Sequence, residues 1–291
     1  MSDFLYAEAG QLTPVDEKLA FDLQNLELKP ATEAFMANIK KIRHFWELTP
    51  STMEIMHVHT RETRKVLKEM LGRDYLKPEE VDQMTPVLSE EVSKRIRERY
   101  EKSGSLKDAA DYDLDRGIQV FSEYVKRTKT LDAGVRSILE NQLLSAWTAF
   151  EALAEDIWNG AKSLHPTFMS GKAYFRRLES IRQAYATLAP VQATINGHYF
   201  APVDHINAMF AKDDLRKLNL VRNVIVHKAG IVDQRFLDDA AVIKWAVSDQ
   251  VDAPIELNGR RVKNLINPVI EAGHLLVRSV DCWVKLKTLG Y

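Results

Sequence analysis

Apolar residues recur every three or four positions along much of the chain, which is the period of an α-helix with one buried face. The pattern is clearest between Asp132 and about Leu164. Its apolar positions, separated by steps of four, four, three, three and four, are Leu139, Leu143, Trp147, Phe150, Leu153 and Ile157. Because these steps stay close to the length of a helical turn, this segment is predicted to form one long helix with an apolar stripe.

Capping signals add further helices. Thr49-Pro50-Ser51 and Asn267-Pro268 each place a proline beside a capping residue, so each is interpreted as the start of a new helix. Gly230 is predicted to end its helix in the left-handed conformation. The other helices are predicted over residues 31–47, 49–71, 89–102, 172–188, 213–230, 234–247 and 267–287.

The helical period is interrupted around two of the chain's three Asn-Gly pairs. Asn258-Gly259 lies within residues 254–262, which are predicted to form a β-hairpin around a tight turn. The other pair, Asn196-Gly197, opens a stretch to Phe200 that is interpreted as a polar loop, with an aromatic pair that either stacks on a base or packs inward. The predicted fold class is therefore all-α, with one short hairpin inserted.

A small, polar stretch at residues 103–113, SGSLKDAADYD, is predicted to separate two parts of the chain. Residues 1–105 are expected to form a helical N-terminal region, and residues 106–291 a helical domain.

Composition narrows the classes of function. Forty Lys and Arg residues offset 41 Asp and Glu residues, so a surface for nucleic acid would have to be a local patch. The single cysteine, Cys282, excludes an intrachain disulfide and is expected to be a buried thiol. Neither a signal peptide nor an apolar run of ~20 residues is apparent, so a cytoplasmic protein is expected. His57 and His59 point to different helix faces and make a poor metal pair, and no cofactor motif is recognised.

The most informative segment is LNLVRNVIVHKAGIVD at residues 218–233. Asn223 and His227 are four residues apart and share a helix face, while Arg222 lies about 100° round from Asn223. Only a long side chain such as that of Arg222 can reach back toward the histidine. Because Val224, Ile225 and Val226 lie between Asn223 and His227 and at least two of them must face the core, the polar trio is expected at the rim of apolar packing.

This segment resembles the R-x4-6-H motif of the HEPN superfamily of helical domains, in the form where a polar residue follows the arginine. SAWTAFE at residues 145–151 is similar to the first bundle helix of such domains, and the resemblance covers about residues 115–290. It implies a metal-independent endoribonuclease without a cofactor, which leaves a 2′,3′-cyclic phosphate. It also implies a homodimer that combines two motifs in one site, and a role as a toxin or antiphage effector.

The resemblance assigns roles to individual residues. His227 would transfer the proton, Arg222 would stabilise the charge on phosphorus, and Asn223 would orient the histidine or contact phosphate. Glu151 is expected to support the site from the long helix, unless it is simply solvated. The candidates for binding RNA, for which a solvated face is the alternative, are Arg176, Arg177, Arg216, Lys217 and Lys228.

Two other functions stay open at this point. One is a non-catalytic HEPN-like adaptor that dimerises or binds a ligand and holds Arg222 and His227 in separate packing roles. The other is a regulator that binds DNA through residues 31–71, although interspersed acidic residues such as Glu33, Glu47, Glu54 and Glu62 disfavour it.

Overall fold

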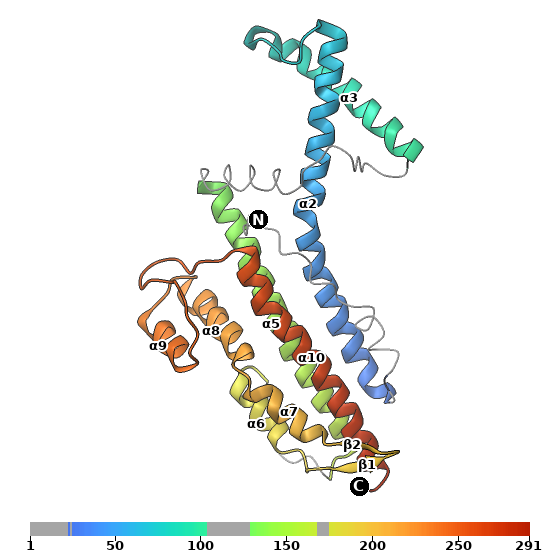
Figure 1. Ribbon diagram of the computed structural model, residues 1–291, viewed down its shortest axis with the longest axis vertical. Coiled ribbons are helices and arrows are strands. Elements are labelled where there is room, and N and C mark those ends of the chain that lie inside the picture. The colour runs from blue at the N-terminus through green and yellow to red at the C-terminus, as the bar shows by residue number, and fades with distance from the viewer. Residues whose placement is uncertain (1–22, 24, 104–128, 168–174) are drawn as a thin grey trace. The chain divides into compact units, whose positions relative to one another are not determined.

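The computed structural model describes residues 23, 25–103, 129–167 and 175–291 (Figure 1). These residues divide into two compact units, one made of residues 45–103 and the other of residues 25–44 together with 130–167 and 175–291. Helices dominate both, and the described residues contain one two-stranded sheet. The predicted all-α fold class is therefore confirmed.

The first unit is a pair of helices joined by a short turn. It contains the end of α2 (Lys29–Leu71), the 3-10 turn η2 (Pro78–Glu80) and α3 (Val81–Ser103). Its core consists of Val66, Leu67, Leu88 and Val92, with Leu71, Leu76, Met84 and Ile96 packed against them. Polar contacts between the two helices add to this packing.

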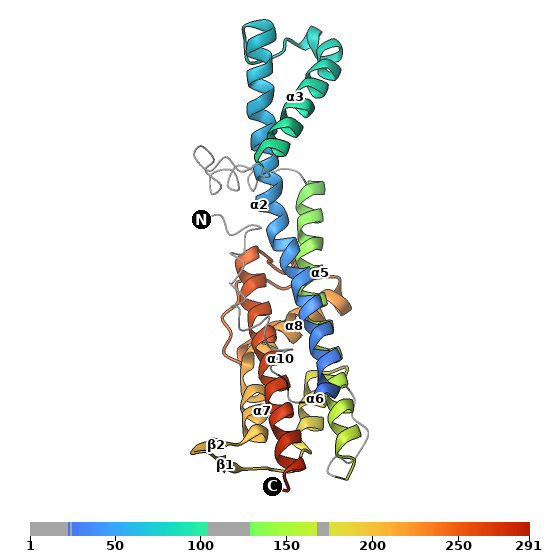
Figure 2. The same cartoon turned by 90° about the vertical axis from the view of Figure 1, so that its right-hand side faces the viewer.

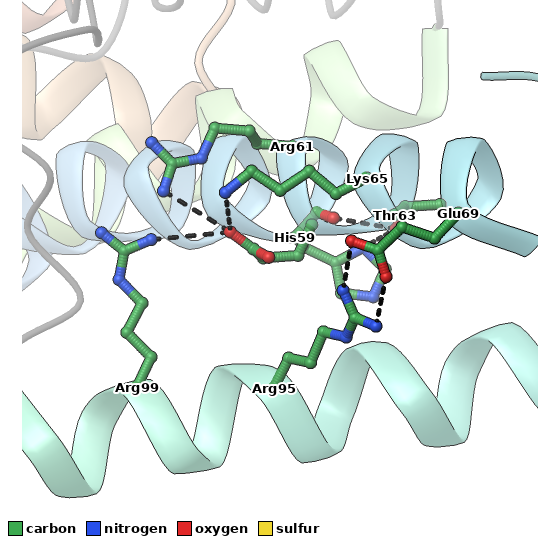
Figure 3. Close-up of polar contacts among 8 residues, drawn as sticks. His59, Arg61, Thr63, Lys65, Glu69, Arg95 and Arg99 are labelled. Atoms are coloured by element: carbon green, nitrogen blue, oxygen red, sulfur yellow. Dashed lines mark hydrogen bonds and ion pairs between the residues drawn. The ribbon is translucent and has the colours of Figure 1, made fainter. Parts of the chain in front are cut away.

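Those polar contacts follow the line where α2 and α3 meet (Figure 3). Arg95 on α3 donates to Glu69 on α2 at 2.7 Å and to Glu91 on its own helix at 2.8 Å. The Arg95 guanidinium holds the pKa of Glu69 below its ordinary value, mainly through this hydrogen bond. Glu62 is buried, and Lys65 and Arg99 lie 3.0 Å and 3.6 Å from its carboxylate.

The second unit is a larger helical bundle (Figures 1 and 2). Helix α10 packs against α7 and α8, while α6 packs against α7 and α8 as well. The largest fully buried side chains include Trp147, Trp283 and Tyr185. Its elements, beside the start of α2, are η1 (Leu26–Leu28), α5 (Lys129–Leu164), α6 (Leu178–Ala186), β1 (Ala193–Ile195), β2 (His198–Phe200), α7 (Pro202–Ala211), α8 (Asp213–Lys228), α9 (Gln234–Val242) and α10 (Gly259–Thr288).

Two predicted helix starts are wrong, because the helices run through the prolines. Helix α2 is continuous past Pro50, and α10 is continuous past Pro268. A proline inside a helix removes one hydrogen bond, which packing on both sides can offset. Around Pro268, this packing comes from Ile266 and Val269, which are fully buried. Helix α3 likewise contains Pro86 and begins at Val81 rather than at Ser89.

The predicted hairpin at residues 254–262 is also wrong. The hairpin instead lies at Asn196-Gly197. Asn196 and Gly197 have positive φ angles of 50° and 77°, and the strands around them pair Ala193 with Phe200. Asn258 instead has extended backbone angles and accepts a hydrogen bond from the Arg261 amide at 2.8 Å. It therefore caps α10, because the residues after it follow a helical period.

The remaining differences concern the lengths of elements. Helix α9 ends at Val242, before the predicted residue 247, and α7 was not predicted. Helix α6 begins at Leu178, while residues 172–174 of the predicted helix lie outside the described residues. The predicted boundary at residue 105 lies outside them too.

The start of α2 belongs to the second unit, although the sequence places it in the N-terminal region. The Asn25 amide donates to the buried Asp281 carboxylate of α10 at 3.0 Å, and the Asn25 side chain donates to the same oxygen at 2.7 Å. Phe35 of α2 is buried against α10 at Gly273. No described helix is both long enough and apolar enough to cross a membrane.

Candidate functional site

A cavity of about 620 Å³ opens in the second unit beside helices α6, α8 and α9. Figure 1 shows these three helices as neighbours on one side of the bundle. The polar residues from α8 that line it are Asn219, Arg222, Asn223, His227 and Lys228. Those from the other two helices and the residues before them are Arg176, Arg177, Glu179, Asp233, Arg235 and Asp239.

The amphipathic pattern of α8 determines which residues face this cavity. Its buried side is formed by Leu215, Leu218, Val221, Val224 and Ile225. Asn219, Asn223 and His227 follow one another at steps of four, so they form a polar stripe along another side. The predicted trio of Arg222, Asn223 and His227 is thus brought to one cavity.

Arg222 and Asn223 are connected to each other. The Nη1 atom of Arg222 donates a hydrogen bond to Oδ1 of Asn223 at 3.1 Å. Both side chains are half-buried, whereas His227 is exposed. The arginine is therefore held by its neighbour, while the imidazole is accessible to a ligand in the cavity.

Glu151 of α5 does not line the cavity. Its carboxylate accepts a hydrogen bond from the Trp147 indole at 2.7 Å. Burial raises the pKa of Glu151, while this hydrogen bond and the charges of Arg222 and Arg176 oppose that rise. Glu151 thus acts electrostatically on two arginines of the cavity from the adjoining helix.

The candidates for RNA binding divide into two groups. Arg176, Arg177 and Lys228 line the cavity, and Lys228 also lies 3.2 Å from Asp233. Arg216 and Lys217 do not line it. They pair with acidic residues in the first turn of their own helix, Arg216 with Asp213 at 3.6 Å and Lys217 with Asp214 at 2.7 Å.

Five polar residues of the cavity were not among the predicted site residues, namely Glu179, Asn219, Asp233, Arg235 and Asp239. Arg235 comes from α9, and nothing in the local sequence shows that α9 packs beside α8. Asn219 is different, because its spacing of four and eight residues from Asn223 and His227 places it on their helix face. That spacing could have identified it.

The end of α8, just beyond His227, is held by contacts from distant segments. Ala229 and Gly230 have positive φ angles of 50° and 76°, and the Gly230 amide donates to the Val224 carbonyl at 3.1 Å. Arg136 of α5 donates to the Gly230 carbonyl at 3.2 Å and to the Ile255 carbonyl at 3.1 Å. The predicted left-handed conformation of Gly230 is confirmed.

Replacing Gly230 by alanine is expected to lower the free energy of unfolding by about 2 to 3 kcal/mol, because a strained backbone and a steric contact add up. An added Cβ would lie 2.9 Å from a carboxylate oxygen of Glu140 and 3.3 Å from the guanidinium of Arg136. Gly197→Ala is the matched control, since Gly197 has a φ of 77° but no described atom within 4 Å of the added Cβ. Gly197→Ala is expected to lower the free energy of unfolding by about 1 kcal/mol. Urea unfolding of both variants measures the difference, and equal losses would show that the contacts at Gly230 do not matter.

The other residues singled out in the sequence lie away from the cavity. Cys282 is half-buried rather than fully buried, and burial raises the pKa of its thiol. Tyr199 on β2 is 62% exposed, so it does not pack inward. In the parts of the chain that the structure describes, no three His, Cys, Asp or Glu side chains are grouped so that they could hold a metal ion, and this includes His57 and His59.

Comparisons of the chain with models of protein families, with curated proteins and with solved structures find no match.

Proposed function

We propose that the second unit is an endoribonuclease of the HEPN type that cleaves RNA without a metal ion. The observation that supports this best is that Arg222, Asn223 and His227 line one cavity together with Arg176 and Arg177 from another part of the chain. An adaptor that held Arg222 and His227 in separate packing roles would not require them to share an accessible cavity.

Five basic and three acidic side chains line the cavity, so the lining has a formal excess of two positive charges, which suits a phosphate group. Arg176, Arg177 and Arg222 form no ion pair with any residue that the structure describes. Their guanidinium groups can therefore donate to the oxygens of a phosphodiester, and each offers a planar pair of donors. Since the chain as a whole carries a formal charge of −1, this cluster is the kind of local patch that RNA binding would need.

The proposed reaction uses the 2′-hydroxyl of the RNA as nucleophile. His227 accepts the proton of this hydroxyl, and the oxygen attacks the adjacent phosphorus. The bond from phosphorus to the 5′ oxygen breaks, and that oxygen takes up a proton, which His227 can return. Arg222 stabilises the negative charge that develops on the phosphoryl oxygens. The products are a 2′,3′-cyclic phosphate and a 5′-hydroxyl.

In this proposal, Asn223 and Glu151 position the arginine. Asn223 accepts the hydrogen bond from Arg222 and restricts its side chain. Glu151 does not line the cavity but interacts electrostatically with Arg222, and this attraction restrains the guanidinium together with Asn223. We further propose that two copies associate so that both motifs face one substrate, and that the enzyme acts as a toxin or antiphage effector.

The test is cleavage of a mixed-sequence, single-stranded RNA in EDTA by the wild-type protein and by His227→Ala. The wild type is expected to produce cyclic-phosphate ends, and the variant purified in the same way is expected to produce none above background. Cyclic-phosphate ends resist phosphatase until mild acid opens the ring, and only after both treatments can the RNA be polyadenylated. Equal cleavage by both proteins would point to a contaminant, and no cleavage by either would reject the proposal.

A further inference from the structure

The polar stripe of α8 extends one helical turn beyond the motif. Asn219 lies four residues before Asn223 and eight before His227, and it lines the same cavity. Because a helix rises about 1.5 Å per residue, the Cα atoms of Asn219 and His227 are roughly 12 Å apart along the axis. A phosphate near His227 therefore leaves room on the same helix face for the sugar and base of one nucleotide.

Asn219 is the asparagine of this stripe whose amide is available. Oδ1 of Asn223 already accepts a hydrogen bond from Arg222. The half-buried Asn219 side chain makes no hydrogen bond with any part of the chain that the structure describes. An amide that lines a cavity can offer a donor and an acceptor side by side, which a single base edge can match.

The lining of the cavity is apolar as well as charged. Leu220 and Val224 on α8, Leu178 on α6 and Phe236 on α9 supply apolar surface to the cavity. Lys228 follows His227 directly, and Arg222 lies between Asn219 and His227 in the sequence. The cavity thus combines charged donors for a phosphate with apolar surface for a base.

We propose that Asn219 is a specificity-determining residue that reads the base edge of an unpaired nucleotide in the cavity. This inference rests on the proposed function, because it takes RNA as the ligand of the cavity. The base has to be unpaired, since its hydrogen-bonding edge would otherwise be occupied by its complement. Asn219 does not take part in the proton transfer, so its replacement changes the preference for a base rather than the chemistry.

The experiment measures binding of four single-stranded RNA homopolymers, of A, C, G and U, to the full chain carrying His227→Ala, so that the RNA stays intact. Asn219→Ala is expected to reduce the preference among the four bases by about 5- to 150-fold. This is the factor by which two hydrogen bonds to one base edge favour that base over the others. Asn219→Asp replaces the amide by a group that only accepts. It is expected to shift the preference toward guanine, whose Watson–Crick edge presents two neighbouring donors.

Asn264→Asp is the matched control, since Asn264 is exposed on α10 and does not line the cavity. This variant is expected to retain the base preference of its parent, and circular dichroism checks that each variant is folded. Unchanged preference in folded Asn219→Ala and Asn219→Asp, or equal binding of all four homopolymers by the parent, would overturn the inference.

Measuring both RNA binding and RNA cleavage tests this inference separately from the proposed function. A protein that binds with the predicted pattern but never cleaves RNA would reject the ribonuclease and retain Asn219 as a base-reading residue. A protein that cleaves RNA with the same base preference in all variants would retain the ribonuclease and reject the role of Asn219.

Discussion

Replacement of Arg222 by alanine is expected to slow RNA cleavage by about 10²- to 10³-fold, which is the usual effect of removing one donor to a developing oxyanion. In the proposed reaction, Arg222 donates to the phosphoryl oxygens, and its hydrogen bond to Asn223 holds it at the cavity. Arg222→Lys keeps the charge but loses the planar pair of donors, so it is expected to recover only part of the rate.

Single-turnover cleavage with excess protein measures this loss without contributions from product release. Arg216→Ala is the matched control, because Arg216 is an arginine of the same helix that pairs with Asp213 and does not line the cavity. Its rate is expected to stay within a few-fold of the wild-type rate. Similar losses in both variants would indicate a general electrostatic effect on RNA binding, and an unaffected Arg222→Ala would contradict the role of this arginine.

The double variant Arg222→Ala/His227→Ala extends this prediction. If both residues act on the same step, the double variant should be about as slow as the slower single variant, since residues that act as a unit are not additive. Losses that multiply would show that Arg222 and His227 act independently, for example with Arg222 only binding RNA.

Gly273→Val is expected to destabilise the second unit by about 3 kcal/mol or more, the upper range for overpacking of a core. Helices α2, α5 and α10 approach one another at Gly273, where an added Cβ would lie 2.5 Å from the Phe35 ring and 3.2 Å from Leu153. Phe35 is only 2% exposed and packs edge-on against His274 at 6.4 Å between ring centroids. The ring therefore has little free space into which it could move.

The matched control is Gly134→Val, at an exposed position of α5 where no described atom lies within 4 Å of an added Cβ. Its expected effect is a small gain in stability, because valine favours a helix slightly more than glycine does. Urea or thermal unfolding, followed by circular dichroism, compares the two variants. A Gly273→Val protein as stable as Gly134→Val would show that the three helices can separate at this point without cost.

Much of the helical structure could be predicted from local sequence. The stripe from Leu139 to Ile157 forms α5, and Gly230 adopts the left-handed conformation that ends α8. Both features depend on residues close in sequence, through helical periodicity in one case and the conformational freedom of glycine in the other. The same periodicity placed Asn223 and His227 on one face of α8.

The Asn-Gly and proline signals are each compatible with two local structures, and tertiary packing determines which one forms. Asn-Gly favours a tight turn at residues 196–197, yet Asn258 caps a helix because the buried residues that follow, Val262 and Ile266, need a helical period to reach the core. Asn267-Pro268 can start a helix or lie within one, and buried residues on both sides of Pro268 keep α10 continuous.

The cavity is the feature that only the folded chain defines. Its walls come from α6, α8 and α9, and the position of α8 relative to the other two depends on which apolar faces pack together. Local sequence is sufficient to place polar side chains on one face of α8, because helix geometry repeats every few residues. It does not determine that Arg176 and Arg177 line one cavity with Arg222 while Arg216 does not, since the shape of the cavity results from long-range contacts between apolar surfaces.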